Sequence, residues 1–164
     1  MVSNPPRAPL HFEHLVQIND ARDPRVTPLS RDQLWRGLVL RAEFPKTFVP
    51  WLDDCEIEHA GEDLLRTLRF GAQVVHDRVT FEPKRQVSFE TLAHDEDRAF
   101  RMNMRIEEPA PGALFVRFTY DARSPEHCDE DPHSGAIKEA YRLADIDTVF
   151  RIRQLADSGV LDEG

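Results

Sequence analysis

One long segment near the end of the chain, residues 133–159, has the apolar spacing of an amphipathic helix. Its main face, with members three or four positions apart, consists of Ile137, Ala140, Tyr141, Ala144, Thr148, Ile152 and Leu155. A second, weaker stripe consists of Leu143, Ile146 and Phe150. So much apolar surface on one helix needs a broad partner. The only candidate is the strand-like region that precedes it, and Asp145 or Asp147 is a candidate point of irregularity within the helix.

In that preceding region the apolar residues recur at every second position, as in β-strands with one buried face. Alternating runs predict strands at residues 10–19, 55–59, 64–70, 75–81, 87–91, 100–106 and 114–120. Short turns such as Gly71-Ala72 join the last six, which indicates an antiparallel meander. A curved sheet that grips one long helix would leave room for a ligand between the two.

Two helices are predicted between the first strand and the meander. Ser30 can cap a helix and Gln33 completes a capping box, so a helix begins after Ser30. It ends near Phe44, because Pro45 disfavours helical geometry in the residue before it. Pro45 suits the first turn of a second, short helix that extends to Leu52.

Length and composition exclude several classes of protein. The 164 residues suit a single domain, with residues 1–9 as a loose leader. No apolar run approaches the roughly 20 residues of a membrane span, and the N-terminus does not resemble a signal peptide, so we expect a cytoplasmic protein. A net charge of -9 with scattered basic residues argues against nucleic acid as a partner. Cys55 and Cys128, far apart and without a CxxC pattern, are expected to be reduced thiols.

Motifs for cofactors are missing from the sequence. The acidic segment 122–134 contains residues that can bind metal, namely His127, Cys128, Asp129, Asp131 and His133. Their spacing does not match that of zinc ligands, so we interpret the segment as an exposed connection rather than a metal site. Because the sequence also has no GxSxG, Gly-rich phosphate loop or HExxH, we expect no cofactor and no metal, and assign no catalytic residue.

The order of elements resembles that of the helix-grip fold. A strand, two short helices, six strands and a long C-terminal helix are typical of the SRPBCC superfamily, which includes START lipid-transfer domains, polyketide cyclases and the major birch-pollen allergen. Gln33-Leu34-Trp35-Arg36-Gly37-Leu38, then Arg41-Ala42 and Phe48-Val49-Pro50, look more narrowly like the AtaL-like subfamily. The resemblance implies an α+β fold with a seven-stranded antiparallel sheet and a hydrophobic cavity. For the AtaL-like group it implies no established reaction.

Polar residues in the inward phase of the strands are the informative exceptions, and they are His14, His59, Arg66 and Asp77. The cavity is predicted to be completed by Phe70, Val79, Phe89, Met102, Met104, Phe118, Tyr120, Tyr141, Ala144 and Thr148. A filled core would have the same composition, so this alternative stays open. In the helix-grip fold the first two strands are neighbours, which would bring His14 and His59 together. They would then form either a catalytic pair or hydrogen-bonded core histidines.

Arg66 and Asp77 should face each other across a hairpin. A turn at Gly71-Ala72 pairs Phe70 with Gln73 and therefore Arg66 with Asp77. Opposite charges at one cross-strand position are the expected way to bury either group. The pair could serve only itself, or Arg66 could anchor a ligand oxygen while Asp77 orients the guanidinium plane.

Three functions are compatible with the sequence. The leading one is a binding or carrier protein for a small hydrophobic or aromatic molecule. The second is an enzyme of polyketide cyclase or hydratase type that acts in the same cavity. The third is a protein interaction module or cochaperone, which would need a large exposed apolar patch. The first leads because it needs only a cavity and a polar anchor, and the third is the least favoured because the outward phases of the strands are mainly charged.

Overall fold

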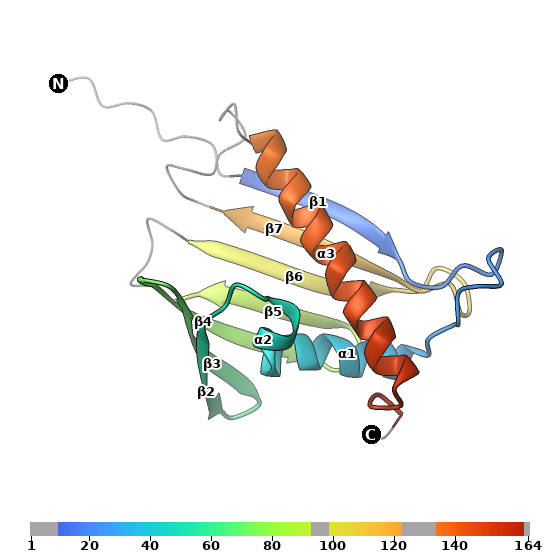
Figure 1. Cartoon of the computed structure of the whole chain (residues 1–164), viewed down its shortest axis with the longest axis horizontal. Coiled ribbons are helices and arrows are strands. Elements are labelled where there is room, and N and C mark those ends of the chain that lie inside the picture. The colour runs from blue at the N-terminus through green and yellow to red at the C-terminus, as the bar shows by residue number, and fades with distance from the viewer. Residues whose placement is uncertain (1–9, 93–98, 123–133, 163–164) are drawn as a thin grey trace.

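The computed structural model describes residues 10–92, 99–122 and 134–162 (Figure 1). Its elements in chain order are β1 (Leu10–Gln17), α1 (Arg31–Glu43), α2 (Pro45–Phe48), β2 (Asp54–Ala60), β3 (Asp63–Phe70), β4 (Gln73–Glu82), β5 (Gln86–Thr91), β6 (Phe100–Glu107), β7 (Phe115–Ala122) and α3 (Ser134–Asp157). This is the α+β helix-grip architecture that the sequence predicts. The predicted leader 1–9 and most of the acidic segment 122–134 lie outside the described residues.

The sheet has the order β1-β7-β6-β5-β4-β3-β2, and every neighbouring pair is antiparallel. β1 and β2 therefore form its two opposite edges. The prediction that the first two strands are neighbours is wrong, and the reason lies in the helices. α3 contacts β1 and α2 contacts β2, so helices occupy the space between the two edges.

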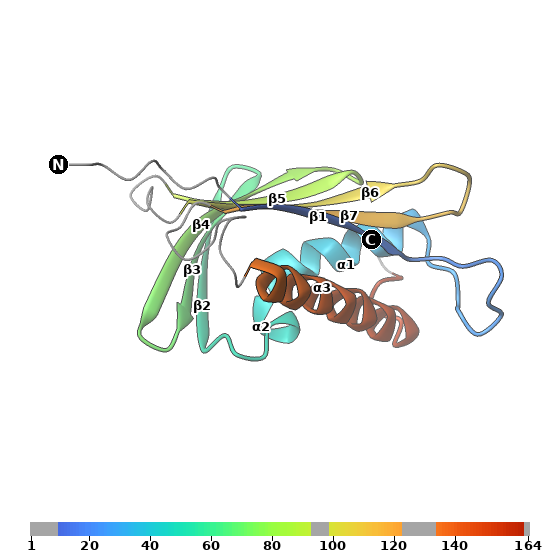
Figure 2. The ribbon, with the colours of Figure 1, turned by 90° about the horizontal axis from the view of Figure 1, so that it is seen from above.

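The sheet is strongly bent, and all three helices lie on its concave side (Figure 2). β2, β3 and the adjoining end of β4 turn away from the plane of β1, β7 and β6. Inward residues of the strands form the core together with apolar residues of α1 and α3. Among the described residues, no helix is long and apolar enough to cross a membrane.

α1 begins and ends where local chemistry requires it. The Ser30 side chain accepts a hydrogen bond from the backbone of Gln33, and the Gln33 side chain accepts one from the backbone of Ser30. The predicted capping box is thus confirmed. α2 is shorter than predicted and ends at Phe48, because Val49 is already extended ahead of Pro50.

α3 is continuous, and only one of its two apolar stripes contacts the sheet. Thr148, Val149 and Ile152 are buried, and Asp145 is buried beside them. The second stripe, Leu143, Ile146 and Phe150, is about half exposed, because a straight helix can turn only one side toward the concave face. The predicted irregularity at Asp145 or Asp147 is also wrong, since the helix runs unbroken through both positions.

α1 and α3 approach each other closely at Gly37. A Cβ atom added to Gly37 would lie 2.6 Å from Cγ2 and 2.9 Å from Cγ1 of Ile152, whose side chain is fully buried. These two atoms belong to the rigid, β-branched part of the isoleucine, so they cannot move aside easily. The absence of a side chain at Gly37 therefore determines how closely the two helices pack.

Replacing Gly37 by Ala should destabilise the protein by about 1 kcal/mol, because the overpacking cost exceeds the gain in helix propensity. In an Ile152→Ala background the space is free, and the same Gly37→Ala change should instead stabilise the fold. Denaturant unfolding of the four chains measures both effects. Gly135→Ala in α3 is the control, since nothing lies within 4 Å of its added Cβ. An equal effect of Gly37→Ala in both backgrounds would contradict the proposed close packing.

Candidate ligand-binding cavity

A cavity of about 440 Å³ lies between the bent half of the sheet and the helices. Its walls come from α1, α2, the segment that follows α2, strands β3 to β7 and α3. Eight of the residues predicted from the sequence border it, and they are Arg66, Phe70, Asp77, Phe89, Met102, Tyr120, Tyr141 and Ala144. Most of the remaining wall is apolar, as in small-molecule sites generally.

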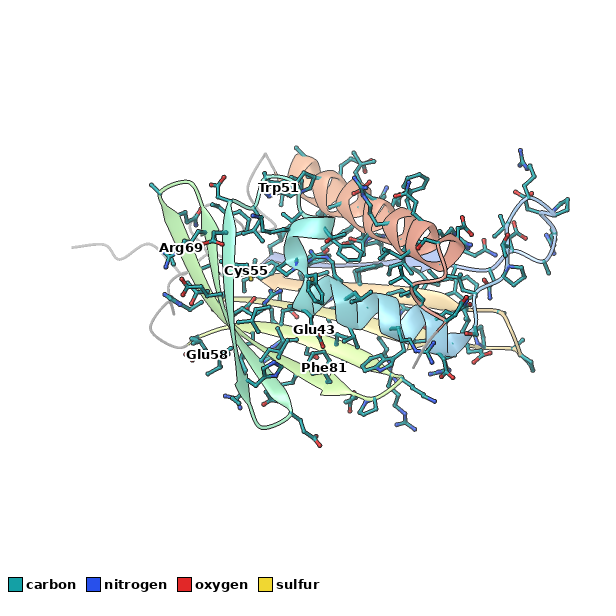
Figure 3. The ribbon with its side chains drawn as sticks, turned by 60° about the horizontal axis from the view of Figure 1, so that its bottom comes forward. Glu43, Trp51, Cys55, Glu58, Arg69 and Phe81 are labelled. Atoms are coloured by element: carbon teal, nitrogen blue, oxygen red, sulfur yellow. The ribbon has the colours of Figure 1, made fainter. Side chains whose placement is uncertain are left out.

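The cavity reaches the surface near the segment that joins α2 to β2. Trp51 in this segment and Val74 at the start of β4 both line it, although 65% of Trp51 and 39% of Val74 is exposed. Figure 3 shows Trp51 above β2, on the side where α3 begins. A ligand could thus enter past two exposed apolar side chains.

Four predicted cavity residues belong to the packed core instead. Val79, Met104 and Phe118 are fully buried and Thr148 nearly so, and none of them borders the cavity. The first three lie in the same core cluster as α1, which covers this half of the sheet. Thr148 donates a hydrogen bond from its hydroxyl to the carbonyl of Ala144, within its own helix.

The predicted histidine pair does not exist. His59 is exposed on β2, and His14 lies on β1 at the opposite edge of the sheet. His14 is not part of the cavity wall either. Its ring is stacked between those of Phe12 and Phe118, at centroid distances of 5.3 and 5.4 Å. His14 therefore matches the alternative of a hydrogen-bonded core histidine.

Arg66 and Asp77 form the predicted cross-strand pair, and both are buried. Nε of Arg66 donates to Oδ1 of Asp77 at 2.8 Å, and a terminal nitrogen donates to Oδ2 at 2.5 Å. The other terminal nitrogen donates to the carbonyl of Ala42 at 3.1 Å, and the guanidinium lies 4.8 Å from the centre of the Phe89 ring. Each nitrogen of Arg66 thus already donates to a protein oxygen.

A second polar group in the wall centres on Asp145 of α3. Tyr120 donates its hydroxyl hydrogen to Oδ1 of Asp145, and Nε2 of His14 lies 2.6 Å from Oδ2. The phenol of Tyr120 is also stacked on that of Tyr141, with ring centres 4.3 Å apart. Tyr120 therefore links an aromatic wall of the cavity to a carboxylate and a histidine behind it.

Burial determines the protonation chemistry of this group. Burial raises the pKa of Asp145 above its ordinary value, while the hydrogen bonds from Tyr120 and His14 oppose the increase. Burial and the neighbouring charge of Asp145 together raise the pKa of Tyr120, which stays a neutral donor at physiological pH. The Tyr120 hydroxyl is therefore a donor to Asp145, and the carboxyl group of Asp145 takes up a proton more readily than an exposed aspartate does.

Sequence reasoning missed three charged cavity residues, namely Glu90 on β5 and, on the helices, Arg41 and Asp145. Arg41 follows Leu38 by three positions, and Asp145 precedes Val149 by four. Each of these two charges thus falls within or next to the buried stripe of its helix, and this was the signal that could have found it. No group of three or more potential metal ligands occurs within residues 10–92, 99–122 and 134–162, whereas the metal-capable residues 127–133 lie outside these ranges.

The chain matches the family of acetylaranotin biosynthesis cluster protein L, AtaL, over residues 16–159. It belongs to this family. The match confirms the subfamily predicted from the sequence. No curated protein matches the chain.

Solved structures of low sequence identity share the fold of this AtaL family member. The di-domain aromatase/cyclase StfQ of the steffimycin pathway is 7% identical with a TM-score of 0.69, over 93% of this chain and 52% of that one. The chain thus spans about half of StfQ. The ZhuI aromatase/cyclase from Streptomyces sp. R1128 is 15% identical with a TM-score of 0.59, over 92% and 94% of the two chains. Truncated norcoclaurine synthase from Thalictrum flavum is 10% identical, with a TM-score of 0.61 over 90% and 95%.

Replacing Arg66 by Met should lower the free energy of unfolding by roughly 3 to 5 kcal/mol, because the Asp77 carboxylate would stay buried without its partner. Adding Asp77→Asn to the same chain removes that charge and should recover part of the loss. Arg69→Met on the same strand is the control, since Arg69 is exposed and should contribute less than about 0.5 kcal/mol. Denaturant unfolding measures all four chains, and a double variant no more stable than Arg66→Met would contradict the coupling.

Replacing Tyr120 by Phe should destabilise the protein by about 1 to 3 kcal/mol near pH 7.5 and by less near pH 4.5. Because burial raises the pKa of Asp145, this group favours the folded state when protonated, and its contribution is lost as the pH rises through the raised pKa. The hydrogen bond from Tyr120 lowers the pKa of Asp145, so removing this bond raises that pKa further. The loss in free energy of unfolding is therefore larger at higher pH.

Tyr141→Phe is the matched control for this pH dependence. Within the described residues, the hydroxyl of Tyr141 makes no hydrogen bond to Asp145 or another group, although its ring stacks on Tyr120. Urea unfolding of both variants and the unaltered chain should be compared across the pH range. A cost for Tyr120→Phe that does not change with pH would show that Asp145 does not titrate there.

Proposed function

We propose that this AtaL family member binds a small hydrophobic or aromatic molecule in the cavity between the sheet and α3. The observation that carries the proposal is the cavity itself. Its volume of about 440 Å³ lies within the range of about 300 to 1,000 Å³ that small-molecule sites occupy. If the inward side chains formed only a filled core, they would leave no empty space of this volume, since native interiors are close-packed.

The shape and chemistry of the walls favour an elongated or planar ligand. Tyr120 and Tyr141 offer a stacked aromatic surface, and Phe89 and Met102 provide apolar surface on the sheet. Two of the compared structures are named as aromatase/cyclases, which supports a ligand with an aromatic or cyclisable carbon skeleton. In this function the protein needs only to enclose the molecule and shield it from water.

An enzyme of polyketide cyclase or hydratase type is the second candidate, and the network of Tyr120, Asp145 and His14 favours it. A proton accepted by the Tyr120 hydroxyl from a bound molecule could pass to Asp145, which His14 holds from the other side. A carrier would return its ligand unchanged. An enzyme would release a product of different mass or ring content, and mass spectrometry of the recovered molecule separates the two.

Replacing Ala144 by Trp should abolish ligand binding while the protein stays folded. Ala144 borders the cavity from α3, so an indole at this position would fill the space that the ligand needs. Native mass spectrometry should find a co-purified small molecule, or saturable uptake of an apolar dye, in the unaltered protein and not in the variant. Circular dichroism checks the fold.

Leu143→Trp is the matched control, because it places the same indole on the adjacent, exposed position of α3. This variant should bind like the unaltered chain. If both variants bind equally well, the ligand does not occupy the cavity. If Ala144→Trp does not fold, Ala144 is a packing residue, and equal binding by the unaltered chain and Ala144→Met would then contradict the proposal.

A further inference from the structure

Arg41 is the charged residue of the cavity that lacks a partner among the described residues. It lies on α1, borders the cavity, and makes no hydrogen bond or ion pair with any residue in the described ranges. Its Nε atom is fully buried and unbonded. Its two terminal nitrogens also make no hydrogen bond within the described residues. Unlike Nε, they keep some accessible surface.

The other charges of the cavity wall are already engaged. Asp77 receives two hydrogen bonds from Arg66, and Asp145 is held by Tyr120 and His14. These carboxylates attract Arg41 only through space, while Arg66 repels it. Burial and the like charge of Arg66 lower the pKa of Arg41, but a guanidinium stays charged in proteins. Within residues 10–92, 99–122 and 134–162, the cavity therefore contains one cation whose hydrogen-bonding capacity is unused.

A buried donor such as Nε of Arg41 is costly when it has no hydrogen-bond partner, and packing alone does not explain it. A methionine or leucine at position 41 would continue the apolar stripe of Leu34 and Leu38 without that cost. Arg66, in contrast, donates hydrogen bonds to Asp77 and to the Ala42 carbonyl from all three of its nitrogens. Fewer of its N–H groups are therefore left for a ligand. The two arginines thus differ in role, although both border the same cavity.

We propose that the terminal nitrogens of Arg41 bind the carboxylate of an otherwise apolar ligand, such as a medium-chain or aromatic carboxylic acid. The inference rests on the proposed function and specifies the ligand class. Two parallel N–H groups match the two oxygens of a carboxylate, and such charge-assisted pairs are strong where water is scarce. The apolar part of the acid then lies along the aromatic and methionine surface, toward the opening at Trp51.

Two matched pairs of probes test the inference. Decanoate is compared with decan-1-ol, and 2-naphthoate with 2-naphthylmethanol, so that each pair shares its apolar part and differs in the anionic group. Isothermal titration at pH 7.5 should show that the unaltered protein binds at least one acid about 10- to 100-fold more tightly than its alcohol, as expected for hydrogen bonds to a charged group.

Arg41→Met should remove this preference and leave the affinity for the alcohol unchanged. Arg22→Met is the matched control, since it removes the same charge from an exposed loop and should preserve the preference. Arg41→Lys keeps the charge but loses the paired geometry of the two N–H groups. This variant should therefore retain only part of the preference for the acid. If Arg41→Met does not fold, Arg41→Lys decides the question, and an undiminished preference would overturn the inference.

Stability separates ligand binding from a structural role. Because Arg41 has no partner among the described residues, Arg41→Met should melt no lower than the unaltered chain, and a clear fall together with an undiminished preference for the acid would overturn the inference by showing a structural role. Alcohols that bind as tightly as the acids would overturn the carboxylate site while the proposed cavity function stands. If none of the four probes binds, the proposed function itself fails and the inference fails with it.

Discussion

A single long helix has to cover the concave face of a seven-stranded sheet, and it is too narrow to do so alone. α1 covers one half of that face and approaches α3 at Gly37 and Ile152, where the missing side chain lets the backbones come close. Beyond the end of α1, β2 and β3 turn away from the rest of the sheet, and among the described residues no further long helix follows there. The contact between α1 and α3 determines where the covered half of the concave face ends. The cavity is thus a consequence of how these two helices pack.

The polar residues of the cavity wall are held in place by one another. Asp77 fixes the plane of the Arg66 guanidinium, and Asp145 is held from two sides by Tyr120 and His14. Such buried pairs rarely add net stability over apolar residues of the same volume. Their value lies in fixed orientation, since a bound molecule would meet donors and acceptors that do not need to reorganise.

The strand pattern made much of this site predictable. Alternation defined the inward phase, and Gly71, with a φ of 59°, forms the tight turn that sets the register of Arg66 against Asp77. The neighbours of β1 were not predictable in this way. Alternation shows that a strand has a buried face, but it does not identify the strand on the other side of its edge.

Alternation also cannot distinguish a cavity wall from a filled core. Met102 and Met104 lie on the same face of β6, two positions apart, yet only Met102 borders the cavity. Met104 lies more deeply in the core cluster that also contains residues of α1, and how α1 packs over the sheet is a long-range contact that strand alternation does not reveal. Arg41 and Asp145 were missed for a related reason. A charge inside an apolar helical stripe lies either at the edge of the stripe or at its centre, and only the tertiary structure separates the two.

The segment that resembles the AtaL-like subfamily, residues 33–50, combines both determinants of the cavity. Leu34, Gly37 and Leu38 pack α1 against its surroundings and so fix where the covered half of the sheet ends. Arg41 and Pro45 follow on the same segment and line the space beyond. Helix packing and cavity chemistry therefore cannot vary independently here, since a shift of α1 along α3 would move the Arg41 guanidinium with it. On this basis the position of the charge is set by the same contact that opens the cavity.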